Sequence, residues 1–242
     1  MYCPDKKGII ADVTQYINRF NGNIIYIDQY VDRLEKVFFM RVVVENNFSS
    51  NSFDSFKNSF NQELGKAYKL KCDFFLEDQI PQLAVFVSKY EHCLYDILSQ
   101  YQSGKLTCKI HFVLSNHEKL KNIAEQFKIP FYHIPILKKN TEKAETQQLK
   151  LLKKYKIDSI VLARYMQILS SNFVNIYPNQ IINIHHSFLP AFPGAKPYHS
   201  AFNRGVKIIG ATSHYVTDEL DGGPIIEQDI VRVSHENEVG DF

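Results

Sequence analysis

The sequence predicts an α/β protein: a doubly wound, mostly parallel, Rossmann-like sheet preceded by a small α+β domain of ferredoxin-like order. Three observations support this prediction. Apolar runs alternate with amphipathic helical periods between residues 83 and 163, as crossover connections between parallel strands require. Two later apolar runs, 206–216 and 224–232, flank a tight Asp-Gly-Gly turn, so the sheet is expected to turn antiparallel there. Residues 1–77 show the order helix, strand, strand, helix, strand, which fits a split βαββαβ unit.

The first domain, residues 1–77, opens with a turn and an amphipathic helix that Gly22 ends. Two strands follow at 24–27 and 37–44, then a second amphipathic helix. Leu70–Leu76 is predicted to be the closing strand. Because the chain starts almost at the first turn, we expect the first strand of this unit to be largely missing.

The second domain, residues 81–242, follows a linker expected at 79–82. Its predicted strands alternate with helices, which indicates crossover connections between parallel strands. The strands are expected at 83–87, 109–114, 131–136, 159–163 and 181–184, and the intervening helices at 94–101, 118–127 and 141–155. The turn after the first strand, 88–93, has no glycine-rich loop of the kind that binds phosphate, which argues against a phosphorylated ligand there.

Composition limits the classes of function. The chain is 45% hydrophobic and 22% charged with a net charge of +2, so nothing indicates a nucleic-acid or membrane partner. Four cysteines occur without a Cys-x-x-Cys pair or a zinc spacing, and sparse cysteine fits a reducing compartment. No signal pattern or membrane-length apolar run is present, so we expect a cytoplasmic protein. His185 and His186 have no third ligand at metal spacing, so no metal is expected.

The stretch from Ile181 to Gly223 carries the candidate chemistry. Asn183 and His185 are two residues apart on a predicted buried strand, so both should point to one face. Ligands of open α/β sheets bind where such strands end. Asn183 can donate to an oxyanion, His185 can donate or move a proton, and Asp221 can orient the histidine or a water. The alternative is that each is an ordinary structural residue, since Asp-Gly-Gly alone is a hairpin signal.

Longer motifs join these residues. The segment N-I-H-H-S-F-L-P-A-F-P-G, followed by S-H-Y-V-T-D-E-L-D-G-G-P-I-I, resembles the formyltransferase family that uses 10-formyltetrahydrofolate. A-R-Y-M-Q-I-L-S at 163–170 and G-P-I-I-E-Q-D resemble the branch that hydrolyses this folate to tetrahydrofolate and formate. The resemblance implies a formyltransferase-like fold and a catalytic triad of Asn183, His185 and Asp221. It also implies a hydrolase of a linear C–N amide bond that needs no cofactor, and that supplies formate for purine biosynthesis and balances one-carbon pools.

The same resemblance assigns further site residues. A folate-binding wall is expected from two segments: Met166, Gln167 and Leu169, with Val216, Thr217 and Asp218. We interpret His92 and Cys93 as walls of a water-side pocket, although a buried cysteine more often serves only packing. The segment 194–199 is expected to begin a helix and to shape the site. In the implied mechanism water attacks the formyl carbon, and Asn183 and His185 stabilise the oxygen that gains charge.

The N-terminal motif P-D-K-K-G-I-I-A-x-V, followed by N-G-N-I-I, resembles an ACT domain. Such domains are small regulatory modules that usually bind an amino acid and pair with another copy. The resemblance implies an amino-acid effector near Asp5, Gly8 and Gly22, and a homo-oligomer. A plain helix-start turn is an equally good interpretation of Asp5 and Gly8, and the shortened first strand weakens the expectation of regulation.

Two alternatives stay open at the level of sequence. One is formyl transfer to an amine acceptor, such as the purine precursor glycinamide ribonucleotide. The other is an inactive regulator that binds a folate or an amino acid. The second gains support from the C-terminus, because the family usually continues through a further helix and strand beyond His235, so the catalytic domain is expected to be short.

Overall fold

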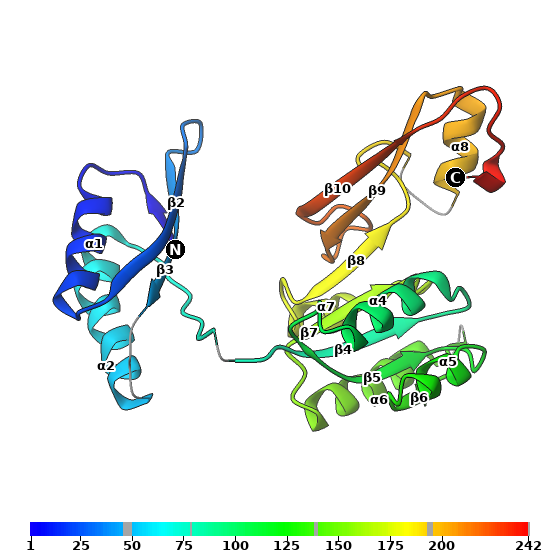
Figure 1. Cartoon of the computed structure of the whole chain (residues 1–242), viewed down its shortest axis with the longest axis horizontal. Coiled ribbons are helices and arrows are strands. Elements are labelled where there is room, and N and C mark those ends of the chain that lie inside the picture. Colours follow the sequence, from blue (N-terminus) through cyan, green and yellow to red (C-terminus); the bar gives the residue numbers. More distant parts are fainter. Residues whose placement is uncertain (46–49, 78, 138–139, 193–195, 242) are drawn as a thin grey trace. The chain divides into compact units, whose positions relative to one another are not determined.

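The protein consists of two compact units, Met1–Gln79 and Ile80–Phe242, and each has its own sheet (Figure 1). The computed structural model describes residues 1–45, 50–77, 79–137, 140–192 and 196–241. Within these ranges, no helix has both the length and the apolar character needed to cross a membrane.

The first unit is an antiparallel three-stranded sheet in the order β1-β3-β2 with helices on one face. Its elements are β1 Tyr2–Pro4, α1 Ile9–Arg19, β2 Asn23–Asp32, β3 Val37–Glu45, α2 Ser50–Phe60, a π-helical turn Asn61–Gly65 and α3 Lys66–Tyr68. Residues of β3 alternate between faces. Phe38 and Met40 are buried against α1 and α2, whereas Phe39 between them is 43% exposed. This alternation is typical of a sheet covered on one face only.

The predicted closing strand at Leu70–Leu76 is wrong. The structure has only an isolated bridge there, in which the backbone groups of Tyr2 and Lys71 bond to each other at 2.8 and 2.9 Å. The reason is the length of the neighbouring edge: β1 spans three residues and offers little backbone for a partner to pair with. The apolar side chains of this segment still serve the core, since Leu70 is 5% exposed.

The second unit is built on a seven-stranded sheet in the order β10-β9-β8-β7-β4-β5-β6. Its strands are β4 Gln82–Val87, β5 Lys109–Ser115, β6 Phe131–His133, β7 Ser159–Ala163, β8 Ile181–His185, β9 Ile208–Tyr215 and β10 Ile225–Arg232. Its helices are α4 His92–Gln102, α5 Lys121–Gln126, α6 Thr141–Lys154, α7 Ser171–Ile176, α8 Pro197–Arg204 and a 3-10 turn Val239–Asp241. The strands from β4 to β8 pair in parallel, and β9 and β10 are antiparallel.

Both faces of this sheet are covered, as the near-continuous apolar strands predict. On β4, Ala84 and Phe86 pack into the core that α6 and α7 share. Val85 and Val87 point the other way, into the core under α4 and α5. All four side chains are fully buried. The predicted doubly wound, mostly parallel α/β fold is therefore confirmed.

Strand order places a crevice in the middle of the sheet. The chain leaves β4 for β5 and β6 on one side, and then returns for β7 and β8 on the other. The order thus reverses between β4 and β7, which is the position at which open α/β sheets bind ligands. The loops that follow β4 and β7 flank this crevice.

The connection from β9 to β10 differs from the predicted tight turn. It spans residues 216–224, and both of its ends are tied down: Val216 N donates to Ile181 O, and Tyr215 N donates to Pro224 O, each at 2.9 Å. Hence the Asp-Gly-Gly segment belongs to a longer loop. After β8, α8 begins at Pro197 with proline in the first turn, where its missing N–H costs nothing. The expected start of this helix at Gly194 lies outside the described residues.

Candidate active site

The structure brings the three predicted polar residues together. Asn183 and His185 lie near the end of β8, and Asp221 reaches them from the β9–β10 loop. His185 Nδ1 lies 3.4 Å from Asp221 Oδ1, and these side chains are only 6% and 8% exposed. Asp221 has a φ of 56°, a left-handed conformation that aspartate tolerates better than most residues. An amide, an imidazole and a carboxylate therefore share one buried corner.

A fourth residue, His214, lies among them and was missed by the sequence analysis. It is 2% exposed, and its Nε2 lies 3.2 Å from Asn183 Nδ2 and 3.8 Å from Asp221 Oδ1. Its Nδ1 lies 2.9 Å from the carbonyl oxygen of Tyr215. Because a carbonyl only accepts, Nδ1 donates to Tyr215 O, and Nε2 is left to accept from the Asn183 amide. The signal that could have found His214 is strand register, because it is the direct partner of Asn183 on β9.

His185 has one ring nitrogen left for a ligand. Its Nδ1 is next to Asp221, and its Nε2 is buried with no hydrogen-bond partner among the described residues. A buried imidazole nitrogen without a partner is costly unless something binding there completes it. The carboxylate of Asp221 thus lies beside one nitrogen of the ring, and the other nitrogen is left for a ligand.

These groups line a cavity of about 240 Å³. All six residues predicted to bind folate also line it: Met166, Gln167, Leu169, Val216, Thr217 and Asp218. They come from the segment after β7 and from the β9–β10 loop. The structure thus joins the two predicted wall segments to the polar corner in one hollow.

The loop that carries Asp221 depends on the glycines that follow it. A Cβ atom added to Gly223 would lie 1.8 Å from the carbonyl oxygen of Tyr215, which no side chain could occupy. A Cβ on Gly222 would lie 2.6 Å from the side chain of Glu219. The chain passes so close to β9 here that only glycine fits at 223. This close approach fixes the position from which Asp221 extends.

A second polar group borders the cavity on the side of α4 and α8. It contains Arg164, directly after β7, and His186, directly after β8, and both line the cavity. Burial, the charge of Arg164 and the neighbouring His185 lower the pKa of His186 to about 4, so its ring is neutral near pH 7. The His186 ring meets Tyr198 of α8 edge to face at 5.4 Å. The sequence analysis did not single out Arg164 or His186 as ligand-binding residues.

The predicted water-side residues begin α4. His92 is exposed, and Cys93 is half-buried. Burial raises the pKa of the Cys93 thiol, and the charge of Arg164 opposes that rise. The neutral thiol therefore dominates near pH 7. A direct part for either residue in the pocket stays a prediction.

Both units of the chain are similar to known proteins. Residues 81–242 match the formyl transferase family, and residues 1–50 match the ACT domain. A formyltetrahydrofolate deformylase of Synechocystis sp. is 51% identical over 240 residues, which is 99% of this chain and 84% of the relative. The crystal structure of a formyltetrahydrofolate deformylase from Pseudomonas syringae pv. tomato superposes with a TM-score of 0.93 at 41% identity, covering 99% of this chain and 80% of that one. The chain belongs to the formyltetrahydrofolate deformylase family.

Membership in the deformylase family confirms the predicted pairing of an ACT domain with a formyltransferase-like domain. The fold is also shared with transferases. Glycinamide ribonucleotide transformylase 1 from Symbiobacterium toebii superposes with a TM-score of 0.65 at 29% identity, over 70% of this chain and 82% of that one. The match to deformylases is therefore both closer and longer than the match to this transferase.

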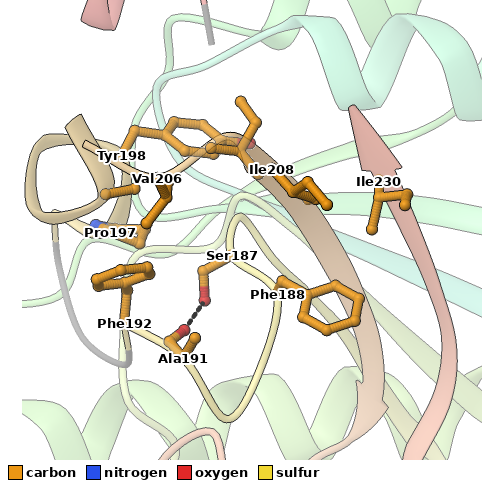
Figure 2. A pocket seen from close by; sticks show the side chains of 12 residues that line it. Ser187, Phe188, Ala191, Phe192, Pro197, Tyr198, Val206, Ile208 and Ile230 are labelled. Atoms are coloured by element: carbon orange, nitrogen blue, oxygen red, sulfur yellow. Dashed lines mark hydrogen bonds between the residues drawn. The ribbon is translucent and has the colours of Figure 1, made fainter. Parts of the chain in front are cut away.

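A second and larger cavity of this deformylase-family chain holds about 320 Å³ and lies between α8, β9, β10 and the loop after β8 (Figure 2). Its walls are almost wholly apolar, formed by side chains such as Phe192, Val206 and Ile230. The hydroxyl of Ser187 lies there too, but it donates to the carbonyl oxygen of Ala191 at 2.9 Å. None of the polar groups of the active-site corner reaches this cavity wall.

The predicted effector residues of the ACT domain occupy turns in the first unit. Asp5 is exposed, and its backbone N–H donates to Lys36 O. Gly8 has a φ of 98° just before α1, so it supplies a conformation that other residues avoid. A Cβ on Gly22 would lie 2.7 Å from side-chain atoms of Ile17 and Val44, so this glycine serves close packing. Binding of an effector at these positions stays a prediction.

Proposed function

We propose that this chain hydrolyses 10-formyltetrahydrofolate to tetrahydrofolate and formate. One observation carries the proposal: Asn183, His185 and Asp221 converge, with His185 Nδ1 3.4 Å from Asp221 Oδ1, in a cavity whose other walls are the predicted folate-binding segments. Relatives named formyltetrahydrofolate deformylase match this chain over nearly its whole length. The catalytic roles below are inferred from that geometry and from the chemistry of the side chains.

The hydrolytic step assigns one task to each group. A water oxygen attacks the formyl carbon while Asp221 accepts the water's proton. The carbonyl oxygen gains negative charge and accepts hydrogen bonds from the Asn183 amide and from Nε2–H of a protonated His185. The bond from the carbon to N10 then breaks as the proton held by Asp221 passes to N10, and tetrahydrofolate leaves together with formic acid, which gives up a proton to become formate.

His214 supports this arrangement through its contact with the Asn183 amide. Its Nε2 accepts one N–H of the Asn183 amide, so the other N–H is free for the formyl oxygen. The carbonyl of Tyr215 holds the ring in that orientation. We infer that His214 is a positioning residue that fixes which way the Asn183 amide points.

The test is hydrolysis by the purified full chain supplied with 10-formyltetrahydrofolate alone, following both formate and tetrahydrofolate. The proposal expects both products in equal amounts without any acceptor. Glycinamide ribonucleotide added to the same assay should remain unformylated. Formyl transfer that needs this acceptor would contradict the proposal, as would folate binding without turnover, which is the outcome expected of an inactive regulator.

We also propose that the reaction needs no metal and no cofactor, since the side chains supply donors for the oxyanion and an acceptor for the proton. Activity should survive chelation and dialysis. The setting is a further proposal: action in the cytoplasm, with the formate used in purine synthesis. We also propose that the ACT domain binds a small-molecule effector, which the resemblance suggests is an amino acid, and that the chain self-associates through this domain. The match of residues 1–50 to the ACT domain supports both proposals.

A further inference from the structure

Arg164 is a cation that the hydrolytic step leaves unused. It lines the same cavity as His185 and Asp221. Its guanidinium carbon stands 4.9 Å from the centre of the Tyr90 ring, and Tyr90 lies in the loop after β4. Its Nε is buried and has no hydrogen-bond partner among the described residues, and no carboxylate within the described part of the chain pairs with it. A guanidinium in such a setting lacks an anion.

The backbone at Arg164 is also strained. Its φ is 57°, in the left-handed region where a residue with a long side chain is uncommon. Strain of this kind persists where the surroundings fix it and often marks a ligand site. The surroundings do fix it, because the next residue but one, Met166, donates its backbone N–H to Ser88 Oγ at 3.0 Å. Ser88 Oγ in turn donates to Asn116 Oδ1 at 2.7 Å, and Ser88 is 2% exposed.

The location agrees with a ligand site. Arg164 follows β7 and Tyr90 follows β4, so the pair stands over the crevice at which the strand order reverses. The segment 163–169, which includes Arg164, resembles a wall of the folate pocket, and the named folate residue Met166 lines the same cavity. Arg164 also has α4 and α8 nearby, since its charge acts on Cys93 and Tyr198. Arg164 therefore borders the cavity close to α4 and α8 as well as close to His185.

We propose that Arg164 binds the formate released by hydrolysis, with its Nε–H and a neighbouring Nη–H forming a two-pronged contact to the carboxylate. This inference rests on the proposed function, because formate arises only if the formyl group is hydrolysed at this corner. Formate is planar, carries one negative charge and presents two oxygens, and the guanidinium edge matches that geometry. The cation–π contact with Tyr90 restricts the movement of the guanidinium at this position.

The main experiment measures inhibition of hydrolysis by added formate. With three non-hydrogen atoms, formate should inhibit the unaltered chain with a constant on the order of 1 mM or weaker. Arg164→Gln should raise that constant about tenfold or more. Arg164→Lys should raise the inhibition constant less than Arg164→Gln does, because lysine keeps the positive charge but lacks the two parallel N–H donors. Arg232→Gln, on exposed β10, is the matched control and should leave the constant unchanged.

A second carboxylate could occupy the same guanidinium, namely the glutamate tail of the folate. The KM of Arg164→Gln is therefore compared for 10-formyltetrahydrofolate and for 10-formyltetrahydropteroate, which lacks the glutamate. If only the full substrate loses affinity and the formate constant stays unchanged, Arg164 holds the tail and the proposal is overturned. A formate constant that Arg164→Gln leaves unchanged overturns it as well, as does an absence of formate inhibition in the unaltered chain.

Direct binding separates this inference from the proposed function. Isotope-labelled formate followed by NMR should show exchange broadening with the unaltered chain and little with Arg164→Gln. This binding measurement needs no turnover, so it tests the role of Arg164 even if hydrolysis is absent. Conversely, normal hydrolysis with identical broadening in both proteins would overturn the formate site and leave the proposed function standing. Circular dichroism of each variant confirms that it is folded.

Discussion

The two cavities of the second unit share β9 but differ in chemistry. The end of β9 at Ile208–Gly210 lines the larger, apolar cavity, and His214 near its other end lines the smaller one. Among the described residues that line the larger cavity, side-chain hydroxyl groups occur at Ser187, which donates to Ala191 O, and at Tyr198. In the smaller cavity, His185 Nε2 and Arg164 Nε lack partners among the described residues. Polar atoms without partners, rather than volume, therefore distinguish the candidate active site.

The largest expected effect comes from removing the carboxylate. Asp221→Asn keeps the shape and tolerates the left-handed φ of 56°, but it can no longer accept the water's proton. We expect kcat/KM to fall about a thousandfold. Asp229→Asn, an exposed change on β10, should keep kcat/KM within about twofold. Steady-state formate release measures kcat/KM for both variants. Near-full activity of Asp221→Asn would show that the smaller cavity is not the site of hydrolysis.

Removing the amide should cost less. Asn183→Ala deletes one donor to the oxyanion, which is worth about 3 kcal/mol or about a hundredfold in kcat. The loss should appear in kcat more than in KM, because the hydrogen bond strengthens only as charge develops. His214→Phe should give part of the same loss by freeing the amide to rotate. A purely structural role would instead lower the melting temperature of both variants and leave kcat intact.

A matched pair of truncations compares the cavities directly. Val216→Ala, in the expected folate wall, should raise KM for 10-formyltetrahydrofolate up to about tenfold. Ile209→Ala, in the apolar cavity, should leave KM unchanged and lower the free energy of unfolding by about 2 kcal/mol, because Ile209 is 8% exposed. Kinetics and denaturant melts measure the two quantities. An increase in KM from Ile209→Ala would assign a binding role to the apolar cavity.

The smallest expected effect is on stability at acid pH. The folded pKa of His186 is about 4, below its ordinary 6.5. Between those values the unfolded chain binds a proton that the folded chain does not, so acidification favours unfolding. The free energy of unfolding should therefore fall as pH is lowered from about 6.5 to about 4. His186→Phe keeps an aromatic contact with Tyr198 and should reduce that slope in denaturant melts. An unchanged slope would show that His186 does not contribute.

How much the sequence could predict depends on the distance between the interacting residues. Asn183 and His185 could be paired from the sequence because strand periodicity fixes their common face. His214 could not, because its place beside Asn183 depends on the register between β8 and β9. The position of Arg164 in the cavity could not be predicted either, because it depends on a left-handed φ and on the order of the strands, which the nearby sequence does not show. Leu70–Leu76 is a different case. Its apolar pattern is typical of a strand, but the structure forms only an isolated bridge there because the neighbouring strand is so short.

The β9–β10 loop has one more implication. Val216, Thr217 and Asp218 form part of the expected folate wall, and Asp221 lies three residues further along the same loop, which is tied at both ends to neighbouring backbone. A change that reshapes the wall here would also displace the carboxylate. Selection for a different pterin would therefore reduce the rate of hydrolysis if it acted on this loop. New ligand preferences should instead evolve through residues 166–169, which can vary without moving the base.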